Sequence, residues 1–130
     1  MKHSYDGNER FYRAILPVFW KDGMVSSAAF IDKNGLSTDC SNRRDCKICV
    51  DTLLNRLPNK DNSVVSIDFI SCCEINIHAK PDPIEGYNDF HTLLVDSEEK
   101  LRISRPKARQ MAETVRFDYV FDASYSIHRN

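Results

Sequence analysis

The chain has 130 residues, of which 42% are hydrophobic and 28% charged, and its formal net charge is -1. These values exclude a disordered protein and fit one core, so we expect a single domain over residues 1–130. A nearly neutral chain also lacks the overall positive charge that attracts nucleic acids or anionic lipids. Without a long apolar run or a hydrophobic segment near Met1, we expect a cytoplasmic protein that does not engage a membrane.

The first third of the chain predicts strands. Aromatic and apolar residues alternate over Arg10–Ile15, which is typical of a strand. The run SSAAFIDKNGLSTD predicts a hairpin with strands at Ser27–Ile31 and Leu36–Thr38. Its turn contains Asn34 and Gly35, which accept positive φ angles at little cost.

The stretch DCSNRRDCKICVD, from Asp39 to Asp51, predicts the start of a helix. Asp45 suits the N-cap position, and Pro58 disfavours helical geometry at the preceding residue. Between them, one apolar stripe recurs with helical spacing. Its members are Cys46, Cys49, Val50, Leu53, Leu54 and Leu57.

The same stretch contains Cys40, Cys46 and Cys49, so zinc is the alternative interpretation, with Cys72 or Cys73 as a further ligand. A structural zinc site needs four ligands, and adjacent residues on a strand point to opposite faces. Free cysteine is also among the most frequently buried residues. We therefore predict reduced core thiols, with no metal and no cofactor.

The second half of the chain predicts further strands and one helix. Strands are expected at residues 63–71, 72–80 and 90–95, with a short one at 100–103, and the prolines in PDPIEGYND indicate a loop. Ser104 suits the N-cap of a helix over residues 105–115, and RFDYVFDA predicts a final strand. Grouped strands with two separate helices favour an α+β fold, a mostly antiparallel sheet with two helices packed on one face.

A cluster of basic residues surrounds the start of that second helix. Cations at a helix N-terminus are unfavourable unless an anion is supplied, so this pattern predicts a site for phosphate. The alternative is a solvated face paired with Glu98, Glu99 and Glu113. The candidate ligands are Arg102, Ser104, Arg105, Lys107 and Arg109.

Two histidines are candidate acid–base groups. On the expected strand 72–80, His78 shares a polar face with Glu74 and Asn76, and the neighbouring strand could add Asp68. His91 follows the proline-rich loop and is expected to approach the same surface. The alternative is the wet side of an antiparallel sheet, on which polar residues alternate.

Three segments resemble a group of small bacterial hypothetical proteins: FYRAILPVF, SSAAFIDKNGLSTD, and DFHTLLV followed by SRPKARQMA. The group starts with a Leu/Phe-Tyr-Arg segment and has a Ser-Ser-x-Ala-Phe hairpin and a His-containing strand before a basic helix. The resemblance implies an association with anti-phage defence and implies no reaction. The positions that it marks are Arg13, Ser26, Ser27, Phe30, His91 and Lys107.

These observations favour a small cytosolic interaction or accessory module that binds a protein partner or a phosphate-bearing ligand. Arg13 joins the basic cluster as a candidate ligand residue, and Trp20 is a candidate anchor for a protein partner. The alternative is a small enzyme that processes RNA or a nucleotide, with His91 or His78 as the acid–base group and the arginines and lysine holding phosphate.

Overall fold

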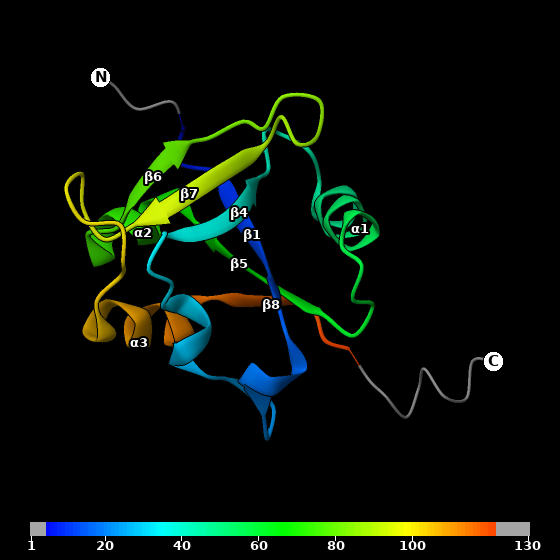
Figure 1. The fold of residues 1–130 in the computed structure, drawn as a ribbon, viewed down its shortest axis with the longest axis horizontal. Helices are drawn as coiled ribbons and strands as arrows, with labels where there is room; N and C mark the ends of the chain where they lie inside the picture. The colour runs from blue at the N-terminus through cyan, green and yellow to red at the C-terminus, as the bar shows by residue number, and fades with distance from the viewer. Residues whose placement is uncertain (1–4, 122–130) are drawn as a thin grey trace.

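The computed structural model describes residues 5–121, which are built around a six-stranded antiparallel sheet in the order β6-β7-β4-β1-β5-β8 (Figure 1). A separate small sheet pairs β2 with β3. The strands are β1 (Arg10–Ile15), β2 (Trp20–Lys21), β3 (Met24–Val25), β4 (Leu36–Cys40), β5 (Ser63–Asp68), β6 (His78–Pro81), β7 (His91–Val95) and β8 (Arg116–Tyr119). The helices are α1 (Cys46–Arg56), α2 (Phe69–Ile75) and α3 (Arg105–Thr114), with 3₁₀ helices η1 (Pro17–Phe19) and η2 (Ser27–Phe30). The predicted α+β class is confirmed.

The sheet separates two apolar cores because side chains alternate along its central strand. Phe11 and Ile15 of β1 face the larger core, which η2, α2 and α3 cover. Tyr12 of β1 faces the smaller core together with Val64 of β5 and the apolar stripe of α1. Two helices therefore do pack on one face, but they are α2 and α3, whereas the pair expected from the sequence was α1 and α3.

Helix α1 forms as the sequence predicts. The Asp45 carboxylate accepts a hydrogen bond from the Ile48 backbone amide at 2.9 Å, and the helix ends just before Pro58. Within the predicted stripe Cys49, Val50 and Leu53 are buried, and Cys46, Leu54 and Leu57 are partly buried against the same core. The N-cap, the apolar spacing and the proline act on the same residues, so no local preference opposes the helix.

The hairpin expected at Ser27–Ile31 is wrong in its first arm. These residues form η2, in which the Ser26 hydroxyl accepts a hydrogen bond from the Ala28 amide and Ala29 and Phe30 are buried. The second arm is β4, and the turn before it needs its glycine. Gly35 has a φ of +88°, and a Cβ there would lie 3.0 Å from the Val95 side chain.

The strand expected at residues 72–80 is also wrong, because its first half belongs to α2. The Asp68 carboxylate caps this helix by accepting from the Ser71 amide at 2.9 Å, and Asn76 ends it with a left-handed φ of 72°. The strand begins only at His78. Residues 100–103 form an isolated bridge from Lys100 to Ser97 in place of the expected strand.

The face of the sheet that α1 covers stays partly open. Eleven helical residues span about 16 Å, whereas six strands extend about 24 Å across a sheet. Cavities border α1 as a result, one at its N-terminal end and one beside its C-terminal half. Over the described residues 5–121, the helices lack the combination of length and apolarity that a membrane crossing needs.

Candidate functional site

The predicted anion position at the start of α3 holds one of the protein's own carboxylates. Asp96, in the loop after β7, accepts a hydrogen bond from the Ser104 backbone amide at 2.9 Å. The Lys107 ammonium lies 3.4 Å from the same carboxylate and donates to the backbone oxygens of Asn76 and Asp96 at 2.8 and 2.9 Å. Lys107 therefore joins α3 to the end of α2 and to this loop.

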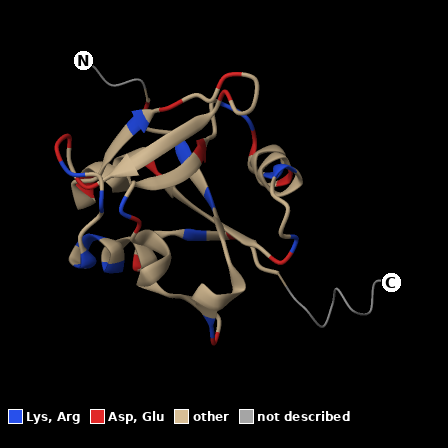
Figure 2. Cartoon of the chain, in the orientation of Figure 1, with Lys and Arg blue, Asp and Glu red and all other residues tan. Residues whose placement is uncertain are grey.

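The other basic residues of this cluster do not converge. Arg102, Arg105 and Arg109 are exposed, and the Ser104 side chain forms no cap hydrogen bond. Figure 2 shows basic residues on α3 and acidic residues in the adjacent loop before it. With the helix end neutralised by Asp96 and the guanidinium groups in solvent, the geometry supports the solvated alternative over a phosphate site here.

Asp96 should give the start of α3 a measurable pH dependence. Burial works to raise its pKa, but the hydrogen bond from Ser104 and the charge of Lys107 outweigh burial and lower it. A lowered folded-state pKa contributes stability that is present above the unfolded value of about 3.9 and is lost as the pH falls through the folded value. We expect Asp96→Asn to reduce the free energy of unfolding by about 1 kcal/mol at neutral pH. In urea unfolding, that difference should shrink below about pH 4; a difference that does not change with pH would contradict the assignment.

Arg13 has a structural role between β1 and η2. Its Nε donates to the Ala29 backbone oxygen and its Nη1 to the Ser37 backbone oxygen, both at 3.0 Å. Burial lowers the pKa of this guanidinium, against the opposing effect of Asp32. The hydrogen bonds of Arg13 thus join η2 to the sheet, and none of them involves the start of α3.

The two candidate histidines lie apart. His78 pairs with Val95 at one end of the β6–β7 ladder and borders a cavity with Phe69 and Cys73 of α2. His91 lies at the other end of β7, where it pairs with Asp39 of β4. The two histidines therefore do not form one site. His91 lies at the end of β7 that is opposite to α3.

His91 borders a cavity of about 350 Å3, here called the loop cavity, between α1 and the loop of residues 82–90. A charged pair lies in its wall: Arg56 Nη2 contacts the two carboxylate oxygens of Asp39 at 2.8 and 2.7 Å. Asn88 donates to the same carboxylate at 2.8 Å, and the Asp39 side chain is only 2% exposed. The rest of the wall combines apolar side chains such as Leu53 and Leu57 with the polar residues Arg13, Ser37 and Thr38.

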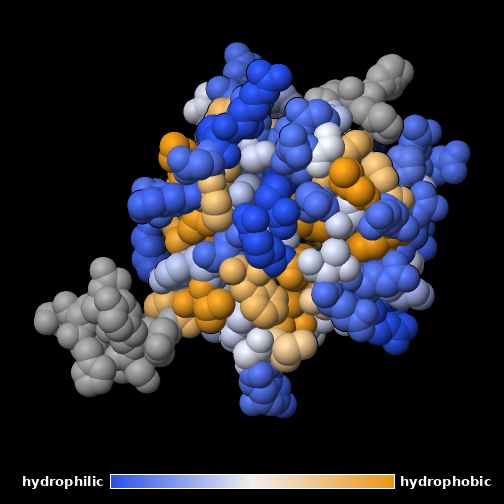
Figure 3. All heavy atoms as spheres, turned by 180° about the vertical axis from the view of Figure 1, so that it is seen from behind, coloured by the Kyte–Doolittle hydropathy of each residue, from blue (hydrophilic) through white to orange (hydrophobic). Residues whose placement is uncertain are grey.

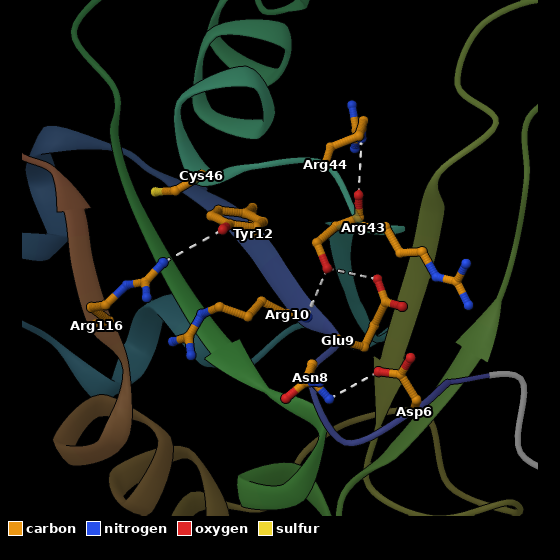
Figure 4. Close-up of a pocket in the computed structure, with 10 residues that line it drawn as sticks. Asp6, Asn8, Glu9, Arg10, Tyr12, Arg43, Arg44, Cys46 and Arg116 are labelled. Carbon is orange, nitrogen blue, oxygen red and sulfur yellow. Dashed lines mark hydrogen bonds between the residues drawn. The ribbon is translucent and has the colours of Figure 1, made fainter.

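A second cavity, of about 380 Å3, lies where α1 begins and is here called the arginine cavity (Figure 4). Four arginines and two acidic residues line it, so its wall carries a net charge of +2 in a protein whose net charge is -1. The positive end of the α1 dipole adds to this potential. The lining residues are Asp6, Asn8, Glu9, Arg10, Tyr12, Ser41, Arg43, Arg44, Cys46 and Arg116.

Arg10 and Arg116 reach the floor of the arginine cavity from two strands that flank β5. Arg10 Nε donates to the Ser66 hydroxyl at 2.9 Å, and Ser66 is also the register partner of Arg116. Arg116 donates from Nε to Asp118 at 2.6 Å and from Nη2 to the Tyr12 hydroxyl at 3.4 Å. Within residues 5–121 the Nη1 group of each arginine forms no hydrogen bond, and Figure 4 shows both guanidinium groups turned toward one part of the cavity.

The layer beneath these arginines is a buried polar cluster. Asp118 is 1% exposed at its side chain, and its Oδ1 accepts from Arg116 and from the Cys46 thiol, the latter at 3.4 Å. Burial raises the pKa of Tyr12, with Cys46 and Asp118 adding to the shift, so its phenol stays neutral. Burial works against the charge of Arg116, but the bond to Asp118 raises the pKa of this guanidinium. The cluster therefore fixes Arg116 as a cation.

On the opposite rim of the arginine cavity, Arg44 and Glu9 are used in contacts within the protein. Arg44 donates to the backbone oxygens of Ser41 and Cys40 and lies 3.8 Å above the centre of the Phe90 ring. Glu9 accepts from the Ser41 hydroxyl and the Asn42 amide. Arg43 is exposed and adopts a left-handed φ of 68°.

Cys46 and Cys49 pack in the smaller core, Cys40 and Cys72 in the larger one, and Cys73 is exposed. All five thiols are free. Burial raises the pKa of Cys72 to about 12. Across residues 5–121, histidine, cysteine and acidic side chains do not gather in any group of three that could hold a metal ion.

Trp20 lies at the base of the β2–β3 hairpin, half-buried against Phe117 with ring centroids 4.9 Å apart. The chain segments that hold Trp20 and Phe117, together with β3, carry exposed apolar residues, and Figure 3 shows apolar atoms gathered near the lower edge of the face that it draws. They are Leu16, Val18, Met24, Phe117, Tyr119 and Val120. Trp20 is thus a contact within the protein, and its role as an anchor for a protein partner stays a prediction.

No family model matches the chain, and neither curated proteins nor solved structures yield a match. The class that the structure defines is an α+β protein with a cationic cavity at the N-terminus of a helix.

The arginine cavity was missed in the sequence because its residues are far apart along the chain. Arg10 and Arg116 meet only through the pairing of β1 and β8 with β5. A signal was present in the alternation of RFYR and RFDY, which places Arg10 with Tyr12 and Arg116 with Asp118 on one strand face each.

Proposed function

We propose that this protein is a small cytosolic binding module that holds a phosphate-bearing ligand in the arginine cavity. One observation carries the proposal: Arg10 and Arg116 are both anchored by the protein, and each keeps an unbonded Nη1 group beside the same cavity. Fixed guanidinium groups bind phosphate through charge-assisted hydrogen bonds and lose little side-chain entropy when they do so. The proposal retains the phosphate-binding function predicted from the sequence, but it assigns the site to the start of α1 and not to the start of α3.

The test is calorimetric titration at low ionic strength with inorganic phosphate, a nucleoside monophosphate and a short RNA. We expect Arg10→Gln and Arg116→Gln each to weaken binding about tenfold or more, because a hydrogen bond to a charged group contributes about 1.5–3 kcal/mol. Glutamine keeps much of the side-chain volume and an N–H donor, but Arg116→Gln also leaves the buried Asp118 carboxylate without its cation, so this variant should lose stability as well as affinity. Circular dichroism and thermal unfolding check the fold of each variant.

Arg105→Gln and Arg109→Gln are the matched controls, because each removes one positive charge from an exposed position on α3. We expect these two variants to bind within about twofold of the unmodified protein, as screened surface charges contribute little. Equal losses in all four variants would show that binding is nonspecific. Absence of binding to all three probes would overturn the proposal.

A bacterial cytosolic setting and an association with anti-phage defence stay predictions. They are independent of the cavity chemistry, and a survey of neighbouring genes tests them.

A further inference from the structure

His91 is presented in one tautomer by the groups around it. Its Nδ1 lies 3.0 Å from the Asp82 backbone oxygen and 3.0 Å from the Asp82 carboxylate. Both partners can only accept hydrogen bonds while Asp82 is ionised, so Nδ1 must carry the proton of the neutral ring. The lone pair of the imidazole is therefore on Nε2.

Nε2 is free and reachable. Among the described residues no side chain or backbone group bonds to it, although the His91 side chain is only 12% exposed. The one buried side-chain nitrogen or oxygen without a partner in residues 5–121 is Asp118 Oδ2, so Nε2 is accessible to solvent. His91 borders the loop cavity and also a second cavity beside Tyr5 and Phe90. As the register partner of Asp39, it lies on the face of the sheet on which Asp39 borders the loop cavity. A carboxylate that orients a histidine, while the second ring nitrogen stays unbonded beside a cavity, is the arrangement of a general base.

The loop cavity supplies two further groups. Arg56 uses only Nη2 to hold Asp39, which leaves its Nε and Nη1 donors unbonded within the described part of the chain. The Tyr87 ring is 58% exposed, and the Arg56 guanidinium lies 5.6 Å from its centroid. A ligand can thus meet a base, the unbonded guanidinium donors of Arg56 and an aromatic surface in one cavity of about 350 Å3.

No described hydroxyl or thiol is hydrogen-bonded to His91 Nε2, so the group that loses a proton is not one of the described side chains, and a hydroxyl of the substrate can supply it. A ribonucleotide phosphodiester combines that hydroxyl with an adjacent anion and a flat base. The base can stack on an exposed tyrosine, and the phosphate suits a guanidinium. These complementary features identify the class of substrate.

We propose that the loop cavity cleaves single-stranded RNA, with His91 as the general base, Asp82 as its positioning residue and Arg56 at the phosphate. The 2′-hydroxyl proton passes to His91 Nε2, and the 2′-oxygen forms a bond to phosphorus. The bond from phosphorus to the 5′-oxygen breaks, and the leaving oxygen takes a proton from water. The hydroxide that remains removes the proton from His91 Nε2, which restores the neutral ring. The products are a 2′,3′-cyclic phosphate and a 5′-hydroxyl end, and no co-reactant is consumed.

The test follows cleavage of a short oligoribonucleotide by mass spectrometry, with the 2′-deoxy oligonucleotide of the same sequence as the substrate control. We expect His91→Gln to lower the rate at least about 100-fold, since general base catalysis contributes about 10²–10⁴-fold. His78→Gln is the matched histidine control and should leave the rate unchanged. Tyr87→Ala should raise KM about tenfold with little change in kcat, because it removes only a stacking surface.

Asp82→Asn separates positioning from a general loss of structure. Ring ¹⁵N spectra of the unmodified protein should show His91 as the Nδ1–H tautomer, and the variant should show a larger Nε2–H population while its fold is retained. Three results would overturn the proposal: an Nε2–H tautomer in the unmodified protein, RNA cleavage no faster than with His91→Gln, or equal cleavage of the deoxy substrate. Phosphate binding in the arginine cavity is measured separately and can succeed when this test fails.

Discussion

Replacing Arg56 with alanine is expected to lower the free energy of unfolding by about 3–5 kcal/mol, the range for breaking a buried ion pair from one side. The Asp39 carboxylate is 2% exposed and, among the side chains of residues 5–121, would keep only Asn88 as a donor. A carboxylate in that position loses its hydration without a cation in exchange, and this is the source of the large cost. Urea unfolding followed by circular dichroism measures the change.

A matched control lies on the same helix. Lys47 also forms an ion pair, with Asp51 at 2.8 Å, but both side chains are largely exposed. Lys47→Ala should change stability by less than about 0.5 kcal/mol, because exposed pairs on a helix contribute about 0.3–0.5 kcal/mol. Adding Asp39→Asn to Arg56→Ala removes the stranded charge and should recover part of the loss. If Arg56→Ala and Lys47→Ala were equally stable, the buried Arg56–Asp39 pair would not be the contact that joins α1 to β4.

Phe30→Ala is expected to cost about 3–5 kcal/mol, as for other large aromatic side chains removed from a core. Phe30 is 1% exposed and lies in the larger core, on η2 where that segment packs against α3. The residues around it, including Leu94 and Met111, leave a gap of only about 10 Å3. The cost therefore comes from lost burial and from a cavity that its neighbours cannot close.

Met24→Ala serves as the control for this prediction, since Met24 lies in nearby β3 and is 60% exposed. It should change the free energy of unfolding by less than about 0.5 kcal/mol. Denaturant midpoints of both variants provide the comparison. A small effect of Phe30→Ala would mean that η2 lies on the core without anchoring it.

The sequence predicted elements well where several local signals coincide. α1 has an N-cap aspartate, an apolar stripe over three turns and a terminating proline, and each signal favours the same ends. For α2 the signals conflict. A seven-residue helix completes about two turns, and Cys73, Ile75 and Ile77 also alternate as in a strand. Capping by Asp68 and the left-handed Asn76 decide the outcome, and both depend on backbone geometry.

The candidate sites were harder to predict because charged residues that are close in the sequence need not be close in the folded protein. The basic residues between Arg102 and Arg109 are close in sequence, yet their helix start is neutralised by Asp96. Arg10 and Arg116 lie at opposite ends of the chain and share a cavity through strand pairing. His91 was correctly predicted to lie on a strand. Its contact with Asp82 was not predicted, because only a loop was expected at that segment.

The order of the strands has a consequence for how the chain is made. β1 is central in the sheet, but both of its partners, β4 and β5, come later in the chain. On a ribosome, Phe11 and Tyr12 therefore emerge well before residues 63–68, which complete their surroundings. Early synthesis exposes apolar side chains that only non-local pairing can cover, and such pairing is slow. We expect nascent chains that end before Asp68 to require chaperone protection.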